Sequence, residues 1–233
     1  MHVLDNPVWH ALTGTHATVA ERKGHAARYL PDVAVFAALT DDATTSAWDA
    51  LGEIVGPGAI AMLARLDVVE PEGWTVAFRA PCRQMWLPDA VTHDDHEVHE
   101  GRAPGPVIGL GASDVPEMLA LVERTRPGPF VTRTVELGTY LGIRDGGELI
   151  AMAGERLHPA GFTEISAVCT DTRYRGRGLA SMLVRAVVRG IRARDETPFL
   201  HLTTENHAAH RVYSALGFET RAELSVVGVR APA

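Results

Sequence analysis

The chain has 233 residues, a hydrophobic content of 46% and a formal net charge of −7 at pH 7. This length allows one large domain or two small ones, and the negative charge argues against nucleic acid as the main partner. The sequence contains no apolar run of the roughly 18 residues that span a membrane and no signal-peptide pattern at its start, so we expect a cytoplasmic protein without a membrane partner.

The first half of the chain is predicted to combine helices and strands. Hydrophobic spacing favours helices over residues 9–30 and 43–55, and short apolar runs favour strands over residues 59–66 and 74–80. Residues 1–105 carry seven Lys and Arg against fifteen Asp and Glu, a balance of −8. This acidity suits either a cationic substrate or an ordinary solubilising surface.

A polar stretch rich in proline and glycine divides the chain near residues 88–105. It separates an N-terminal α/β region, residues 1–105, from a second domain, residues 106–233. Within the stretch, His93, His96 and His99 stand at three-residue spacing, which on a helix would bring three imidazoles to one side. The surrounding residues are acidic and offer no apolar shell, so we expect a solvated linker and no metal site.

The second half begins with a predicted strand at residues 107–110. A capping signal at Asp114 starts a helix to about residue 124, and a second short helix is expected over residues 130–138. The segments that follow are predicted to be a β-hairpin over residues 140–144 and 148–157, a strand over 164–170, a helix over 179–194, and a strand over 198–204.

The first of two motifs joins the 164–170 strand to the next helix through Arg173-Tyr174-Arg175-Gly176-Arg177-Gly178-Leu179-Ala180. The two glycines let the backbone turn tightly and approach a ligand closely. The free N–H groups and the dipole of the helix's first turn form an anion site, and three arginines surround it. A pyrophosphate group is the expected ligand of this site. The glycine pattern of dinucleotide-binding folds and the lysine of a P-loop are both absent.

The second motif is Asn206-x-x-Ala209-x-x-x-Tyr213-x-x-x-Gly217-Phe218. Asn206 suits a helix N-cap and Gly217 the position just after the helix. Ala209 and Tyr213 lie on one helical face together with Val212 and Leu216.

The two motifs, in this order and with a helix and a strand between them, resemble the GCN5-related N-acetyltransferases and their FR47-like branch. The resemblance covers residues 106–230, just over half of the chain. It implies a central, mostly antiparallel α/β sheet flanked by helices. The N-terminal region lacks both motifs and resembles at most a degenerate copy of the same fold, so we expect no second cofactor site there.

The resemblance also implies the acyl donor and the residues that bind it. Acetyl-CoA is expected as the donor, and no metal is expected. In family members the matching Asn contacts the pantetheine arm, and the matching Tyr lies beside the thioester sulfur. The expected binding residues are Val168, Cys169, Arg173, Arg175, Gly176, Arg177, Gly178, Leu179, Ala180, Asn206 and Ala209.

Acyl transfer to an amine requires that the protonated amine first lose a proton. Glu164, at the start of the strand that leads into the glycine loop, is the first candidate for the general base, because some family members carry a catalytic glutamate there. A substrate-positioning or merely structural role for Glu164 stays open, and Glu155 and His201 are the alternatives.

Tyr213 is the expected acid for the departing thiolate, and backbone N–H groups near Val168 are expected to polarise the acyl carbonyl. In family members the pantetheine runs beside the 164–170 strand, and the resemblance therefore implies direct transfer in a ternary complex. Cys169 has no His or Asp at a spacing that would activate it, so we expect a packed strand residue there. The two cysteines, Cys82 and Cys169, indicate no disulfide framework.

The expected function is that of an N-acetyltransferase that acts on a small-molecule amine or on a peptide or protein amine. Two alternatives stay open: a catalytically silent acyl-CoA-binding module, and an N-acyltransferase that transfers a longer acyl group to an amino acid. The sequence leaves the oligomeric state open as well, a homodimer included.

Overall fold

The computed structural model describes residues 2–88 and 103–233. Within these residues, eleven strands form a single sheet in the order β1-β2-β3-β4-β11-β5-β10-β9-β8-β7-β6. The strands are β1 (Ala20–Lys23), β2 (Ala26–Tyr29), β3 (Phe36–Leu39), β4 (Ile60–Arg65), β5 (Thr75–Trp86), β6 (Val107–Leu110), β7 (Tyr140–Asp145), β8 (Glu148–Glu155), β9 (Phe162–Thr170), β10 (Thr197–Thr203) and β11 (Glu219–Arg230).

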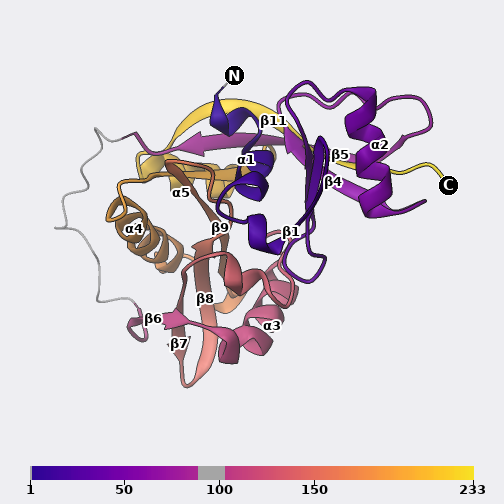
Figure 1. Cartoon of the computed structure of the whole chain (residues 1–233). Helices are drawn as coiled ribbons and strands as arrows, with labels where there is room; N and C mark the ends of the chain where they lie inside the picture. The colour runs from indigo at the N-terminus through magenta and orange to yellow at the C-terminus, as the bar shows by residue number, and fades with distance from the viewer. Residues whose placement is uncertain (1, 89–102) are drawn as a thin grey trace.

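The described helices lie on the faces of this sheet and at its ends (Figure 1). The α-helices are α1 (Pro7–Thr13), α2 (Thr45–Val55), α3 (Val115–Thr125), α4 (Leu179–Arg192) and α5 (His207–Ala215). The short 3-10 helices are η1 (Val3–Asp5), η2 (Ala17–Val19), η5 (Ala112–Asp114), η6 (Thr134–Leu137) and η7 (Thr172–Tyr174).

The sheet is mixed and mostly antiparallel, which confirms the predicted fold class. Only two of the described pairs are parallel, β3 with β4 and β9 with β10. Helices α3 and α4 flank β8 and β9 (Figure 1). In α4 the apolar positions expected from the sequence are buried, among them Leu183, Val187 and Ile191, which join the core under the second half of the sheet.

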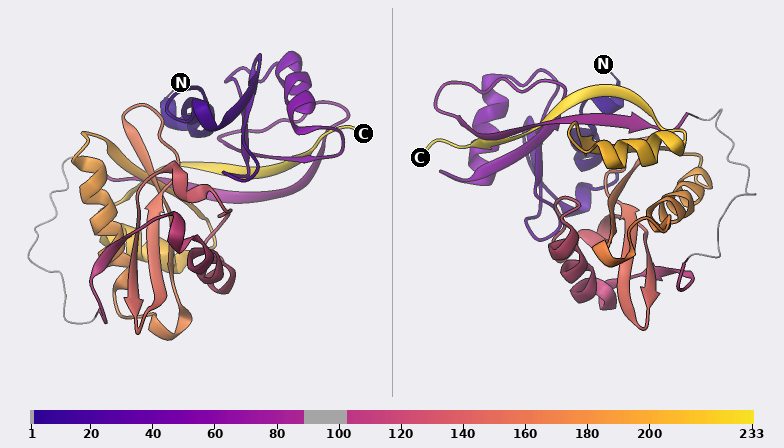
Figure 2. Two further views of the ribbon diagram at one scale, coloured as in Figure 1. Left: turned by 60° about the horizontal axis from the view of Figure 1, so that its bottom comes forward. Right: turned by 180° about the vertical axis from the view of Figure 1, so that it is seen from behind.

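The two halves of the chain repeat one order of elements. The first half runs β1-β2-β3-α2-β4-β5, and the second runs β7-β8-β9-α4-β10-β11, with a parallel pair at the same place in each. The last strands are exchanged, because β5 pairs with β10 and β11 pairs with β4. The long strands β5 and β11 also pair with each other and run from one half into the other (Figure 2). One continuous sheet therefore crosses the expected division near residues 88–105.

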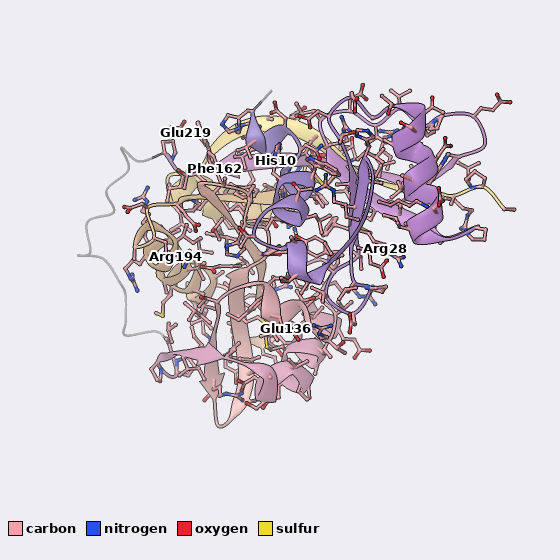
Figure 3. The ribbon with its side chains drawn as sticks, in the orientation of Figure 1. His10, Arg28, Glu136, Phe162, Arg194 and Glu219 are labelled. Atoms are coloured by element: carbon pink, nitrogen blue, oxygen red, sulfur yellow. The ribbon has the colours of Figure 1, made fainter. Side chains whose placement is uncertain are left out.

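Contacts between the halves are both apolar and polar. One cluster of buried residues draws Leu12 and Tyr29 from the first half and Leu137 and Phe199 from the second. In η6, Thr134 donates its hydroxyl hydrogen to the carbonyl oxygen of Val33 at 2.8 Å. Figure 3 labels Glu136, which belongs to the same short helix. These contacts hold the first half against the second, so that it can form a wall of any site located there.

Two expected helices are wrong. Residues 9–30 contain the end of the short helix α1, the 3-10 turn η2 and the hairpin β1–β2, because Gly14 ends the helix and Gly24 turns the hairpin at a φ of 49°. Strand β2 also pairs with β3, and β3 joins the hairpin to the rest of the sheet through the more distant strand β4. Residues 130–138 contain only one turn of 3-10 helix, η6. The strand expected over residues 74–80 is longer than predicted, because β5 continues to Trp86. The other expected elements occur close to their predicted bounds.

Candidate active site

Strands β9 and β10 separate partway along their length. They pair only from Phe162 with Thr197 to Ile165 with Leu200. Beyond that point β10 pairs with β5 alone, and β9 bends where Ala167 adopts a φ of 53°. The register between β8 and β9 shifts at the same place, which leaves Ala167 and Val168 without ladder partners on β8. An opening with unpaired strand edges results.

The glycine loop lies at this opening and leads into α4. Gly176 and Gly178 adopt φ values of 76° and 79°, a region that favours glycine. A side chain at either position would meet no atom within 4 Å, so both glycines face open space at the N-terminus of α4. The predicted turn is present, and the first-turn N–H groups of α4 are positioned as an anion site requires.

The structure separates the three arginines of this loop. Arg175 lines the cavity described below. Arg173 instead pairs with Asp171 at 3.0 Å and with Glu148 at 2.7 Å. The hydrogen bonds that Asp171 accepts from Arg173 hold the pKa of Asp171 well below its usual range. The guanidinium of Arg177 lies 4.8 Å from the ring centroid of Tyr174.

The second motif has the local structure that the sequence predicts. The Asn206 side chain accepts a hydrogen bond from the N–H of Ala209 at 3.0 Å and caps α5. Gly217 follows the helix with a φ of 82°, and Phe218 is buried. Asn206 itself remains exposed and lines the cavity.

A cavity of about 810 Å³ joins the two motifs to the first half of the chain. At one end lie the glycine loop and the start of α4. At the other end lie Phe36, Met62 and Phe78, which come from β3, β4 and β5. The expected binding residues that line it are Val168, Cys169, Arg175, Gly176, Gly178, Leu179, Ala180, Asn206 and Ala209, whereas Arg173 and Arg177 do not.

Glu164 does not line this cavity, because it is fully buried behind the wall. Its carboxylate accepts two hydrogen bonds from Arg156, at 2.8 and 2.7 Å, and one from His201 Nδ1 at 2.7 Å. Burial alone would raise the pKa of Glu164, but the charge and hydrogen bonds of Arg156, helped by His201, lower it to about 2. Glu164 is therefore an anion at any ordinary pH.

His201 lines the cavity, yet both of its ring nitrogens have protein partners. Nδ1 faces Glu164, and Nε2 lies 3.0 Å from Gln84 Nε2. The Gln84 amide is fixed, because its nitrogen also donates to the Leu4 carbonyl and its oxygen accepts from Arg221. His201 Nε2 must therefore accept, and Nδ1 must donate, so the contacts assign a neutral imidazole to His201.

Glu155, the other alternative for the base, is also buried and outside the cavity. Its carboxylate accepts hydrogen bonds from Arg194 at 2.9 Å and from the N–H of Thr139 at 3.1 Å. Both oxygens of Glu155 are thus engaged within the fold.

Tyr213 lines the cavity from α5, and its hydroxyl makes no hydrogen bond to the described residues. Burial, with a smaller contribution from Cys169, raises the pKa of Tyr213 above its usual range. Burial likewise raises the pKa of the Cys169 thiol to about 11. Tyr213 therefore keeps its proton, and Cys169 is a thiol and not a reactive thiolate.

The sequence interpretation missed Arg156 and the residues of the first half that line the cavity. Arg156 directly follows a run of buried residues in β8, and a single arginine at such a place is an unusual signal. The contribution of Phe36 had no local signal, because it depends on β3 joining the sheet through β4.

The described residues contain no cluster of three or more His, Cys, Asp or Glu side chains suited to a metal ion. His93, His96 and His99 lie outside the described residues. Among the helices that the structure describes, none has the length and apolar character needed to cross a bilayer.

Comparisons with known proteins agree with this geometry. The family model described as FR47-like protein matches residues 140–227. A crystal structure from Novosphingobium aromaticivorans, assigned to the GNAT family of acetyltransferases, is 36% identical, with 100% of both chains covered and a TM-score of 0.86. A GCN5-related N-acetyltransferase from Kribbella flavida is 17% identical, with 98% of this chain and 96% of that chain covered and a TM-score of 0.64. No curated protein sequence matches the chain.

Proposed function

Because the chain belongs to the GNAT family, we propose that it transfers an acetyl group from acetyl-CoA to a primary amine within a ternary complex. The observation that carries this proposal is one continuous cavity, which runs from the glycine loop past Tyr213 to a wall built by the first half of the chain. A donor and an acceptor can enter such a cavity from different ends and meet in the middle.

The glycine loop is the proposed site for the pyrophosphate of the donor. The N-terminus of α4 offers free N–H groups and the positive end of the helix dipole. Arg175 adds a positive charge on the cavity wall. Arg173 is less available to the pyrophosphate, because its guanidinium already pairs with Asp171 and Glu148. Its proposed role is to hold the loop in shape.

The opening between β9 and β10 is the proposed path of the pantetheine arm. Beyond Ile165 the edge of β9 that faces β10 has no strand partner among the described residues, so it can hydrogen-bond an extended amide chain as a neighbouring strand would. Asn206 and Ala209 lie along the same path on α5. Backbone N–H groups near Val168 would then polarise the acyl carbonyl and stabilise the oxyanion that forms on attack.

Tyr213 is proposed as the acid that protonates the departing thiolate. Its hydroxyl is protonated and has no hydrogen-bond partner among the described residues, so it can turn toward a sulfur atom in the cavity. Its raised pKa makes it a weaker acid than free tyrosine. Its advantage therefore rests on its position and on exclusion of water more than on acid strength.

For Glu164 we propose a positioning role in place of direct proton transfer. A carboxylate with a pKa near 2, covered by Arg156 and His201, is a weak base and has no free path to the cavity. The acceptor amine would instead lose its proton to water at the open end of the cavity, where Phe78 is 40% exposed. Glu164 holds Arg156 and His201 in the wall that faces the acceptor.

The direct test is thiol release from acetyl-CoA with a panel of primary amines. Release that depends on the amine, together with the matching N-acetyl product, supports the proposal. Binding of acetyl-CoA without release for any amine would favour the silent acyl-CoA-binding module. Faster release with longer acyl donors would assign a different acyl group to the same site.

A further inference from the structure

The charged side chains that line the cavity are all positive. Arg126, Arg156 and Arg175 line it, and no Asp or Glu of the described residues does. Arg175 belongs to the glycine loop and Arg126 follows α3, whereas Arg156 lies near the wall formed by the first half. A strongly cationic acceptor would find no carboxylate there, although residues 1–105 as a whole are acidic.

Two sets of contacts fix the orientation of the Arg156 guanidinium. Its Nε and Nη2 atoms donate to the two oxygens of Glu164, and its guanidinium carbon lies 4.8 Å from the centroid of the Phe36 ring. The third nitrogen, Nη1, makes no hydrogen bond to the described residues. Since the Arg156 side chain is 11% exposed and lines the cavity, the edge with Nη1 is available to a ligand. A guanidinium edge of this kind binds a carboxylate with two hydrogen bonds.

The rest of this end of the cavity is apolar. Phe36, Met62, Phe78, Ala80 and Val226 contribute the lining from β3, β4, β5 and β11. Such walls favour a large hydrocarbon or aromatic group on the part of the ligand that lies against them.

The charges that surround Arg156 already balance. Glu164 is an anion, Arg156 a cation and His201 neutral, and the neighbouring Arg221 pairs with Asp5. A ligand that brings one negative and one positive charge leaves the balance unchanged. An amino acid does so, whereas a simple amine brings only the positive charge.

Resting on the proposed function, we propose that the acceptor is an amino acid with a large apolar side chain, whose carboxylate binds Arg156 and whose side chain lies against Phe36, Met62 and Phe78. Arg156 is then the residue that selects the acceptor. The amine projects from the anchored carboxylate toward Tyr213 and the thioester. A peptide N-terminus, which lacks the adjacent carboxylate, is a poorer ligand for this end of the cavity.

The first experiment compares product binding, which needs no turnover. N-acetyl-L-phenylalanine and N-acetylphenethylamine differ in the carboxylate, and neither has an amine that titrates. We expect calorimetry on the CoA-saturated protein to give a Kd at least about tenfold lower for the carboxylated product. Equal affinities, or tighter binding of the neutral product, would overturn the proposal whether or not the protein transfers acetyl groups.

The second experiment removes the anchor without leaving a lone buried charge. The double variant Arg156→Met/Glu164→Gln replaces the ion pair with neutral side chains of similar size, and its fold is checked by its melting temperature. We expect the preference for the carboxylated product to disappear. Arg175→Met is the matched control, because it removes a cavity arginine at the donor end and should weaken CoA binding while the preference remains. A preference that survives in the double variant would contradict the anchoring role.

A third readout separates this inference from the proposed function. With acetyl-CoA as donor, KM should be lower for L-phenylalanine than for phenethylamine, and the double variant should remove that difference. Thiol release with both amines at equal KM would keep the acetyltransferase function and refute the carboxylate anchor. Preferential product binding without any thiol release would refute the transferase function and keep the anchor.

Discussion

Arg156 and Glu164 form a two-point ion pair in the wall of the cavity, with Nε 2.8 Å from Oε2 and Nη2 2.7 Å from Oε1. They stand at the two ends of the β8–β9 connection, where the N–H of Arg156 also donates to the carbonyl of Glu164 at 3.0 Å. The local backbone thus brings the two side chains together, and His201 closes the arrangement from β10.

Removing one partner of this ion pair should lower the free energy of unfolding more than removing both partners. Arg156→Met leaves the Glu164 carboxylate buried without its counter-charge, and we expect a loss of about 3–5 kcal/mol in the free energy of unfolding. The double variant Arg156→Met/Glu164→Gln should recover most of that loss, because no buried charge remains. Urea denaturation at pH 7 measures both. Equal losses in the single and double variants would mean that the pair is not energetically coupled.

The same pair should make stability depend on pH in the acidic range. The pKa of Glu164 is about 2 in the folded protein, below its ordinary value near 4.5. A depressed pKa contributes stability that is complete above pH ~4.5 and is lost as the pH falls toward ~2, here roughly 3 kcal/mol. Glu164→Gln should flatten the stability profile in this window. Glu219→Gln, at an exposed position in Figure 3, is the control and should leave the profile unchanged.

The positioning role of Glu164 predicts a specific pH dependence of activity. If the free amine is the reacting species, kcat/KM should rise with pH until the pH reaches the pKa of the amine. The whole profile should shift when an amine of different pKa is used. Glu164→Gln should lower kcat/KM without changing the shape of that profile. An acidic limb that belongs to the enzyme and disappears in Glu164→Gln would identify Glu164 as the general base after all.

The glycine loop predicts a backbone effect on donor binding. Gly176→Val places a branched side chain at a φ of 76° and into the open space that the donor would occupy. We expect the Kd for acetyl-CoA to rise at least tenfold, or about 1.4 kcal/mol. Gly147→Val, at a φ of 90° in the β7–β8 turn and away from the cavity, is the matched control. It should reduce stability but leave the Kd unchanged, and similar Kd values for both variants would remove the loop from the donor site.

Sequence reasoning succeeded where local chemistry decides the structure. The cap at Asn206, the apolar face of α4 and the turn at Gly176 and Gly178 depend on residues within a few positions of one another. The same holds for strand β6, whose predicted bounds agree with the structure.

It failed where distant pairing decides. The hairpin β1–β2 joins the sheet through the pairing of β3 with the distant β4, and the cavity wall depends on the exchange of β5 and β11 between the halves. For the same reason the sequence indicated Glu164 and His201 as candidate bases. It could not show that Glu164 pairs with Arg156 or that His201 is hydrogen-bonded to Gln84.

Tyr213→Phe tests the proposed acid with little change in packing, because it removes only a hydroxyl that has no partner among the described residues. If that hydroxyl protonates the departing thiolate, kcat should fall by about 10²-fold while the Kd for acetyl-CoA changes little. Burial raises the pKa of Tyr213, so the wild-type enzyme should show no loss of this acid below pH ~10.

The defect should shrink with a donor whose leaving thiol is more acidic, because its thiolate needs less help from an acid. Single-turnover thiol release with both donors measures this difference. An equal loss with the two donors would assign Tyr213 a role in placing the thioester, since positioning does not depend on the basicity of the leaving group. Unchanged kcat with either donor would mean that water protonates the thiolate and that Tyr213 serves only as part of the packing between α5 and the cavity.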